Sequence, residues 1–242
     1  MGSVQRVKHA VLLAGGKGTR LRPYTTSLPK PLVPVGDLSI VEIVLRQLAA
    51  RGFDRATLAI GHLGHLIAAV VGDGSQWGIA VDYVSEDVPL GTMGPVVAIL
   101  DRLPEHFLVL NGDVLTDLDY GSVLGSHLDS AAALTIATYR RQVAIDFGVL
   151  DLDSGRVVGF HEKPTLDYSV SMGVYGLSRS TLADYAAGTP LGFDELVHHL
   201  IAAGARIASF PFGGYWLDIG RPEDYDKANA DFPRIRSTLL AD

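Results

Sequence analysis

The chain of 242 residues contains no cysteine, and its acidic residues outnumber its lysines and arginines by 27 to 20. Without cysteine there are no disulfides and no thiolate metal sites, so a metal would need oxygen or imidazole ligands. The formal net charge of −7 argues against a nucleic-acid-binding domain, which normally presents a basic face. The N-terminus has no long apolar segment typical of a signal peptide or a membrane span. We therefore expect a soluble, cytoplasmic protein.

Hydrophobic residues make up 48% of the chain, which is enough to bury the core of one large α/β domain. In the first half, strand patterns alternate with helical patterns, as in βαβ units: strands at 7–14, 56–60, 80–84 and 106–110, and helices near 40–51, 63–71 and 94–102. The second half is richer in strands, at 132–138, 147–151, 156–161, 170–177 and 205–210, with helices near 179–187, 193–203 and 221–230. We predict a single α/β domain over 1–242, with an acceptor-binding lobe in its second half.

A glycine-rich turn with nearby cations follows the first predicted strand. The glycines of Gly15–Gly18 permit positive φ angles and let successive backbone N–H groups converge on an anion. Arg20, Arg22 and Lys30 add positive charge that suits phosphate oxygens. The spacing matches neither a P-loop nor a dinucleotide-binding fingerprint. An ordinary glycine turn would explain the glycines but not the surrounding cations and prolines, so the pattern favours a cradle for a nucleoside triphosphate.

Seven motifs carry a resemblance to a known family. Gly-Gly-Lys-Gly-Thr-Arg-Leu-Arg-Pro at 15–23 and Pro-Lys-Pro-Leu-Val-Pro-Val-Gly at 29–36 resemble the signature of the sugar-1-phosphate nucleotidyltransferases, and the look is closest to mannose-1-phosphate guanylyltransferase-like members without a β-helix domain. Five further motifs follow in the family's order, at 89–92, 111–113, 162–164, 173–175 and 216–220.

The resemblance implies a Rossmann-like mixed, mostly parallel sheet flanked by helices, with a β-rich sugar-binding lobe. It also implies transfer of a nucleotidyl group from an NTP to a sugar 1-phosphate with release of pyrophosphate, by a homo-oligomer (dimer or tetramer). Residues up to about 115 would bind the NTP, and residues from about 116 to 242 the sugar phosphate. We expect no appended domain, and neither nucleic acid nor a membrane is expected as a partner.

The family's nucleotide-binding positions can be carried over residue by residue. Arg20 and the backbone of 15–19 would hold the β- and γ-phosphates, while Lys30 would approach the α-phosphate. The expected nucleotide-binding residues are Leu13, Ala14, Gly15, Gly16, Gly18, Thr19, Arg20, Lys30, Glu86, Gly91 and Thr92, and the expected catalytic residues are Arg20, Lys30 and Lys163. The attacking phosphate oxygen is already anionic, so we expect no general base and assign no role to the eight histidines.

Asp113 and Asp218 are the candidate metal ligands. Each follows an apolar stretch and adjoins a glycine-containing turn, and two carboxylates suit one octahedral Mg²⁺. Taken singly, Asp113 reads as a turn residue at a strand end and Asp218 as a helix cap. Their matching family contexts favour the metal, and we expect Mg²⁺ as the cofactor.

The expected sugar-phosphate residues are Gly112, Gly148, Glu162, Lys163, Ser171 and Val174. By the resemblance, Lys163 would bind the sugar phosphate and Glu162 would accept hydrogen bonds from sugar hydroxyls, although a lone Glu-Lys pair is usually a solvated surface pair. Many family members have Asn-Ala-Gly where this chain has Ser-Met-Gly at 171–173, a variant seen in glucose-1-phosphate enzymes. The identity of the sugar therefore stays open.

Glu86 is the residue that bears on the choice of base. A carboxylate accepts hydrogen bonds, and guanine offers two adjacent donors where uracil and thymine offer one. We therefore favour GTP with a mannose-like hexose or heptose 1-phosphate over dTTP or UTP with glucose 1-phosphate, although Glu86 also reads as a solvated turn residue. The remote alternatives are a non-catalytic NDP-sugar sensor and a glycosyltransferase using Asp117-Leu-Asp119 or Asp151-Leu-Asp153, both of which read as turns.

Overall fold

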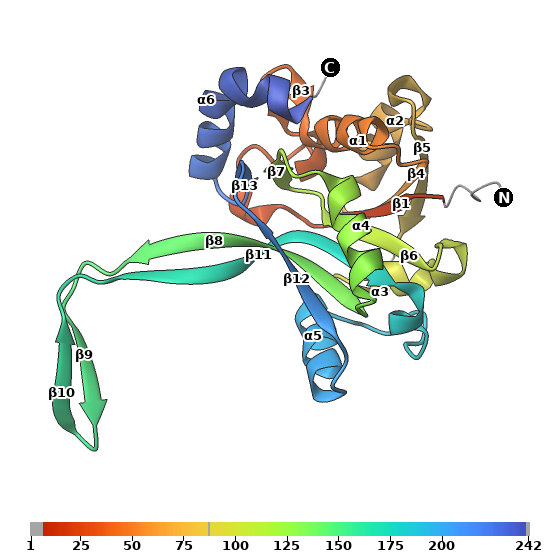
Figure 1. Ribbon diagram of the computed structural model, residues 1–242. Helices are drawn as coiled ribbons and strands as arrows, with labels where there is room; N and C mark the ends of the chain where they lie inside the picture. The colour runs from red at the N-terminus through yellow and green to blue at the C-terminus, as the bar shows by residue number, and fades with distance from the viewer. Residues whose placement is uncertain (1–6, 87, 241–242) are drawn as a thin grey trace.

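A seven-stranded sheet forms the centre of the computed structural model, which describes residues 7–86 and 88–240. Its strand order is β12-β8-β11-β6-β1-β4-β5 (Figure 1). The strands are β1 His9–Ala14, β4 Arg55–Ile60, β5 Ala80–Ser85, β6 His106–Asn111, β8 Leu134–Ala144, β11 Thr165–Ser178 and β12 Ile207–Phe212. Only β11 runs antiparallel to its two neighbours, β6 and β8. The predicted mixed, mostly parallel sheet is confirmed.

Helices α1 Ile40–Ala50, α2 Gly64–Val71, α3 Gly94–Ala98, α4 Tyr120–Ser130 and α5 Phe193–Ala202 cover the two faces of this sheet. Helix α6 Pro222–Leu239 lies beside them. Side chains alternate along each strand, so Leu12 packs in the core under α1, α2 and α4, whereas Val11 packs in the core under α3 and α5. A third cluster joins α6 to α1 and to the short strands β2 Pro34–Val35 and β3 Leu38–Ser39. Within the described ranges, no helix combines the length and apolarity that crossing a bilayer requires.

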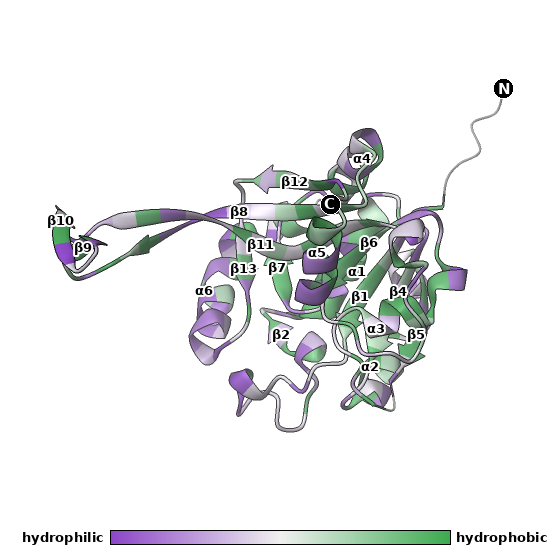
Figure 2. Ribbon diagram, turned by 90° about the horizontal axis from the view of Figure 1, so that it is seen from below, coloured by the Kyte–Doolittle hydropathy of each residue, from purple (hydrophilic) through white to green (hydrophobic). Residues whose placement is uncertain are grey.

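Two more pairs of short strands complete the fold. β7 Val114–Thr116 pairs with β13 Trp216–Asp218, and β9 Val149–Asp153 pairs with β10 Arg156–His161. The β9–β10 hairpin lies at the far end of a long ribbon made by β8 and β11, which leaves the body of the molecule (Figures 1 and 2). Sequence patterns predicted β9 and β10, but they predicted neither β7 and β13 nor the length of the ribbon.

Several predicted elements need correction. Residues 179–187 do not form an α-helix, because only Arg179–Leu182 is helical, as one 3₁₀ turn. The helix predicted at 94–102 breaks at Ile99 into α3 and a 3₁₀ turn. No helix was predicted at α4, whose interior glycines Gly121 and Gly125 weaken the helical pattern. Asp119 caps that helix by accepting from the Ser122 N–H, and Asp151 and Asp153 lie in strand β9 rather than in a turn.

Two buried histidines should make the fold sensitive to acid. Burial lowers the pKa of His9 to about 4, and burial together with the neighbouring His106 lowers that of His127 to about 4. A histidine titrates near 6.5 in the unfolded chain, so lowering the pH from 7 to 5 protonates the unfolded state but not the folded one. We expect the free energy of unfolding to fall by about 1–2 kcal/mol per buried histidine over this range.

Urea denaturation at pH 7 and pH 5 measures this loss. His127→Gln should be less stable at pH 7 but lose less stability on acidification than the wild type. His65→Gln, at an exposed position of α2, should keep the wild-type pH dependence. Equal pH dependence in the wild type and His127→Gln would show that His127 is not held neutral.

Candidate functional site

The candidate site begins where β1 and β6 end side by side. Leu13 of β1 is in register with Asn111 of β6, and the next N–H, that of Gly112, donates to the Leu13 carbonyl over 3.0 Å. A Cβ on Gly112 would lie only 2.7 Å from this carbonyl oxygen, so the close approach requires glycine. Ligands of α/β sheets bind at such carboxyl ends of parallel strands.

The glycine-rich turn follows β1 directly. Gly18 has a φ of 59°, and its carbonyl accepts from the Thr25 hydroxyl over 2.7 Å, which fixes the turn before the 3₁₀ segment Thr19–Leu21. Ala14 is buried at the end of β1, whereas Gly16 and Thr19 are exposed. The turn is thus fixed by its contacts with the protein, and its exposed residues are accessible to a ligand from solvent.

Lys30, Asp113 and Asp218 come together beside this turn. Asp113 immediately precedes β7, and the pairing of β7 with β13 sets Asp218 opposite Val114. The Ile219 N–H donates to the Asp113 carbonyl over 3.0 Å. Lys30 Nζ lies 2.6 Å from Asp113 Oδ2, and these side chains are only 11% and 26% exposed. Three residues that are far apart in the sequence therefore form one partly buried charged cluster.

Charge balance in this cluster suits a divalent cation. Partial burial raises the pKa of Asp218, the nearby Asp113 carboxylate raises it further, and Lys30 and Arg20 oppose this rise. Arg20 lies close to the turn after β13, since a Cβ on Gly220 would be 3.7 Å from its guanidinium. Among the described residues, no group of three or more histidines and carboxylates stands ready for a metal. The Asp113 and Asp218 oxygens suit a hard divalent cation, whose coordination phosphates and water would complete.

A pocket of about 350 Å³ adjoins the cluster. It is lined by Leu13, Gly15, Gly16, Ala59, Glu86, Pro89, Gly91, Thr92, Pro95, Asn111, Gly112 and Asp113. Glu86 Oε1 accepts from the Leu90 N–H over 3.0 Å, while Oε2 faces Gly15, where a Cβ would lie 3.5 Å away. Partial burial raises the pKa of Glu86. Glu86 is therefore a pocket residue rather than a freely solvated turn carboxylate.

A second hollow, of about 520 Å³, is lined in part by Asp218. It is lined by Arg20, Tyr139, Arg141, Trp216, Leu217, Asp218, Gly220, Arg221, Asp224 and Lys227. Trp216 and Arg221 were not predicted as site residues. The available signal was their position, because Trp216 is the first residue of the Trp-Leu-Asp-Ile-Gly motif and Arg221 directly follows it. Trp216 is fixed by its indole N–H, which donates to the Met172 carbonyl over 3.1 Å.

The expected sugar-phosphate residues fall into two groups. Val174 pairs with Leu110 of β6, and the Ser171 hydroxyl donates to the Tyr175 hydroxyl over 3.1 Å, so both lie with Gly112 on the body. Gly148, Glu162 and Lys163 lie instead at the base of the β9–β10 hairpin. A Cβ on Gly148 would be 3.6 Å from Glu162 Oε2.

The extended β11 separates these two groups. Its unbroken pairing with β8 from Ser171 to Thr165 spans six residue steps, or roughly 20 Å. Within one chain, the structure does not bring Glu162 and Lys163 to the cluster around Asp113.

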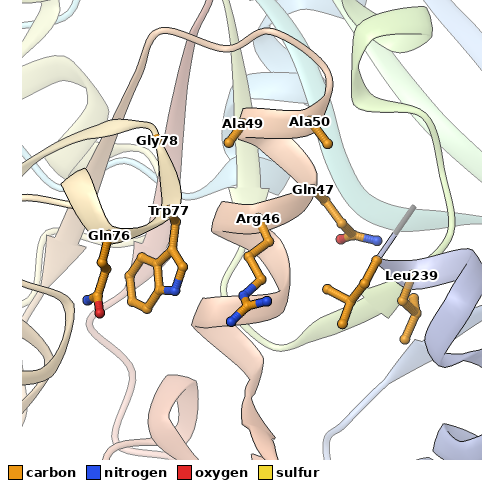
Figure 3. A pocket seen from close by; sticks show the side chains of 9 residues that line it. Arg46, Gln47, Ala49, Ala50, Gln76, Trp77, Gly78 and Leu239 are labelled. Carbon is orange, nitrogen blue, oxygen red and sulfur yellow. The ribbon is translucent and has the colours of Figure 1, made fainter. Parts of the chain in front are cut away.

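A further hollow lies elsewhere, between α1, the 3₁₀ turn Ser75–Trp77 and the end of α6 (Figure 3). Its volume is about 520 Å³, and its lining includes Arg46, Gln47 and Trp77. None of the predicted site residues lines it, and Arg46 is paired with Glu42 over 2.7 Å. The strand ends therefore remain the better candidate.

Comparison with known proteins agrees with this geometry. The nucleotidyl transferase family model matches residues 9–234. The chain is 35% identical over 232 residues to mannose-1-phosphate guanylyltransferase of Mycobacterium tuberculosis, and 31% identical over 240 residues to UTP–glucose-1-phosphate uridylyltransferase of Synechocystis. These matches cover 93% and 90% of the chain but only 64% and 62% of the relatives, so the chain spans less than two thirds of their length.

Solved structures show the same architecture. HddC from Yersinia pseudotuberculosis, in complex with GMP-PN, superposes with a TM-score of 0.73 at 29% identity, covering 93% of this chain and 99% of HddC. The family model extends over nearly the whole chain, including the residues that build the strand-end cluster. The chain belongs to the nucleotidyl transferase family.

Proposed function

We propose that the protein transfers a guanylyl group from GTP to a mannose-like hexose or heptose 1-phosphate and releases pyrophosphate. The observation that carries this proposal is the cluster of Lys30, Asp113 and Asp218 beside a glycine-rich turn at the carboxyl ends of the parallel strands. The mannose-1-phosphate guanylyltransferase relative and the HddC structure with GMP-PN support guanine as the base.

Different residues of the proposed NTP-binding half, up to about residue 115, would bind different parts of the nucleotide. The pocket beside Glu86, Gly91 and Thr92 would hold the base, and the Glu86 carboxylate would accept from guanine N1–H and N2–H. The N–H groups of the turn after Leu13, together with Arg20, would hold the β- and γ-phosphates. Lys30 would then lie near the α-phosphate, where negative charge is neutralised during transfer.

The chemical step needs no protein nucleophile. A phosphate oxygen of the sugar 1-phosphate would attack the α-phosphorus in line, while the bond from that phosphorus to the oxygen bridging to the β-phosphate breaks and the electron pair leaves with pyrophosphate. Mg²⁺ held by Asp113 and Asp218 would supply charge neutralisation on the phosphates. The protein's task is to position the two substrates and to exclude water.

The acceptor would bind on the second half of the chain. On the body side, Gly112 lines the pocket, Val174 of β11 pairs with Leu110 of β6, and Ser171 pairs with Thr138 of β8. Gly148, Glu162 and Lys163 would supply the groups that hold the sugar and its phosphate. We propose residues 116–242 as the acceptor-binding half of a single domain.

The test is pyrophosphate release with Mg²⁺ across GTP, UTP, dTTP, CTP and ATP, each paired with mannose, glucose, N-acetylglucosamine and heptose 1-phosphates. We expect the strongest turnover with GTP and mannose or heptose 1-phosphate. The Synechocystis relative favours one second candidate, a UTP- or dTTP-dependent glucose-1-phosphate nucleotidyltransferase, which a strong signal in those combinations would identify. No turnover with any pair would contradict both.

The base assignment predicts a specific defect in Glu86→Gln. A glutamine side chain keeps one acceptor for the Leu90 N–H but cannot accept from both guanine donors. We expect kcat/KM for GTP to fall about 10- to 100-fold, the cost of an unmade hydrogen bond to a charged group. The measurement compares GTP with ITP, which lacks the guanine amino group.

In the wild type GTP should be the better substrate, and in Glu86→Gln the two nucleotides should become nearly equal. Glu105→Gln, on the exposed side of the body, should keep the wild-type preference. An unchanged GTP-to-ITP ratio in Glu86→Gln would remove Glu86 from the base pocket.

A further inference from the structure

Residues 139–170 form a projecting arm. Its stem is the ribbon in which Tyr139–Ala144 pairs with Thr165–Val170, and its tip is the β9–β10 hairpin. Both views show the arm reaching away from the helices and the rest of the sheet (Figures 1 and 2). From residue 140 to 169, nearly every residue is exposed. The arm thus has no core of its own.

The stem of the arm has one polar and one apolar face. Residues opposite each other in an antiparallel pair share a face, so Arg140, Gln142 and Asp167 lie on one side, where Arg140 and Asp167 form an ion pair of 2.9 Å. The other face carries Tyr139, Arg141, Val143, Leu166, Tyr168 and Val170. Such alternation is typical of a ribbon that buries one face against another surface.

The tip repeats this division. Leu152 pairs with Val157 and Leu150 with Phe160, so these four side chains share one face. Leu152 is 67% exposed and Phe160 is 60% exposed. Among the described residues, nine of the fourteen exposed large hydrophobic side chains fall between 143 and 168. A surface of this kind marks an interaction site, and a lone two-stranded ribbon is at best marginally stable in water.

The residues that would complete the acceptor site lie on this arm. Glu162 and Lys163 adjoin the tip, roughly 20 Å along β11 from Ser171. Lys163 has a φ of 42°, in the left-handed region that non-glycine residues seldom adopt, at the bend between stem and tip. The bend is therefore a defined feature of the arm, and the continuous ladder of the stem opposes folding the tip back onto its own body.

We propose that two copies of the chain exchange arms, so that the tip of each copy brings Glu162 and Lys163 to the Asp113 cluster of the other. This inference rests on the proposed function for the roles of those two residues. The partner that the exposed apolar arm and the incomplete acceptor site both require is a second copy of this chain. The body of that copy holds the half-site that lacks Glu162 and Lys163, and its own arm makes the same contact in return by two-fold symmetry.

Charge also favours this pairing. The hollow beside Asp218 is lined by three cations of the body, Arg20, Arg221 and Lys227, and by Arg141 of the stem, against two carboxylates. Residues 145–164 of the arm carry Asp146, Asp151, Asp153 and Glu162 against Arg156 and Lys163. An arm with excess negative charge would meet a body surface with excess positive charge, which favours association.

The first test is the oligomeric state, which does not depend on activity. We expect the wild type to sediment as a dimer and Leu152→Asp/Phe160→Asp to sediment as a monomer with an unchanged helical circular dichroism signal. Val70→Asp, at an apolar position on α2 that is 54% exposed, is the matched control and should stay dimeric. A monomeric wild type would overturn the proposal.

The second test is complementation between two inactive chains. Asp113→Asn has a defective body and an intact arm, and Glu162→Gln/Lys163→Met has the reverse. The two are co-expressed with different affinity tags and purified through both. In an arm-exchanged heterodimer one of the two sites is fully wild-type, so about half of the wild-type activity should return. A heterodimer as inactive as its parents would show that each arm serves its own body.

A third readout separates failure of this inference from failure of the proposed function. Since the chain has no cysteine, Ser154→Cys at the tip and Thr26→Cys beside the glycine-rich turn provide single labelling sites. A donor on one chain and an acceptor on the other should show strong energy transfer in the dimer, whether or not the wild type turns over any substrate. Weak transfer between chains would overturn arm exchange, and strong transfer without turnover would leave it standing while contradicting the proposed function.

Discussion

Asp113→Asn should lower pyrophosphate release by about 10³-fold or more, the loss expected when several kcal/mol of charge stabilisation disappear from the transition state. The substitution keeps the size of the side chain but removes the negative charge that pairs with Lys30 over 2.6 Å and that we propose as a metal ligand. Steady-state kinetics with GTP and mannose 1-phosphate, as a function of Mg²⁺ concentration, measures the effect.

A matched control distinguishes this loss from a general effect of replacing an aspartate. Asp119 caps α4 by accepting from the Ser122 N–H, and asparagine caps helices equally well. Asp119→Asn should therefore retain wild-type activity and stability. If Asp113→Asn kept most of its activity at every Mg²⁺ concentration, Asp113 would not be a metal ligand.

Lys30→Met should lower kcat by about 10²- to 10³-fold, the range seen when one preorganised charge stabiliser is removed. The Lys30 side chain is only 11% exposed and its ammonium group lies 2.6 Å from Asp113 Oδ2, so water replaces it poorly. Lys30→Arg should recover little, because a planar guanidinium does not fit the position of a compact ammonium. Single-turnover kinetics separates this loss of kcat from any change in nucleotide binding.

The control here is Lys8→Met, which removes a lysine that donates to the Arg51 carbonyl at the opposite end of β1. It should leave kcat unchanged. Since Lys30 and Asp113 are in contact, the double variant Lys30→Met/Asp113→Asn should lose much less than the product of the two single losses. Full additivity would indicate that the two residues act independently.

Much of the fold could be predicted from local patterns. β1, β4 and β6 are mostly apolar runs bounded by turns, and α1 has an apolar stripe beginning after the Ser39 cap, so local signals and the final fold agree. The failures have local causes as well. α4 contains Gly121 and Gly125, and the stretch after Arg179 carries helix-compatible residues that end in a single 3₁₀ turn.

The length and direction of the arm could not be predicted from local sequence patterns. The strands predicted at 132–138 and 170–177 stopped where polar residues begin, because Arg140, Gln142 and Asp167 interrupt the apolar run. These residues form the polar face of the ribbon. The strands therefore continue, with polar and apolar side chains alternating, beyond the point where the uninterrupted apolar run ends. The arm's direction away from the body is set by tertiary structure and had no signal in the sequence.

The candidate site was predicted in its composition but not in its geometry. The motifs named Lys30, Asp113 and Asp218, yet their proximity depends on the pairing of β7 with β13, two three-residue strands that no periodicity reveals. Trp216 and Arg221 entered the site only through the hollow they line. Conversely, Glu162 and Lys163 were expected in one pocket with Ser171, and the chain alone does not place them there.

The most direct test of the central proposal is the transfer of label from [α-³²P]GTP to mannose 1-phosphate, followed by chromatography of the products. We predict labelled GDP-mannose and an equal amount of unlabelled pyrophosphate from the wild type, and neither above background from Asp113→Asn. Label released as GMP without acceptor, or equal transfer by the wild type and Asp113→Asn, would contradict nucleotidyl transfer at the Lys30–Asp113–Asp218 cluster.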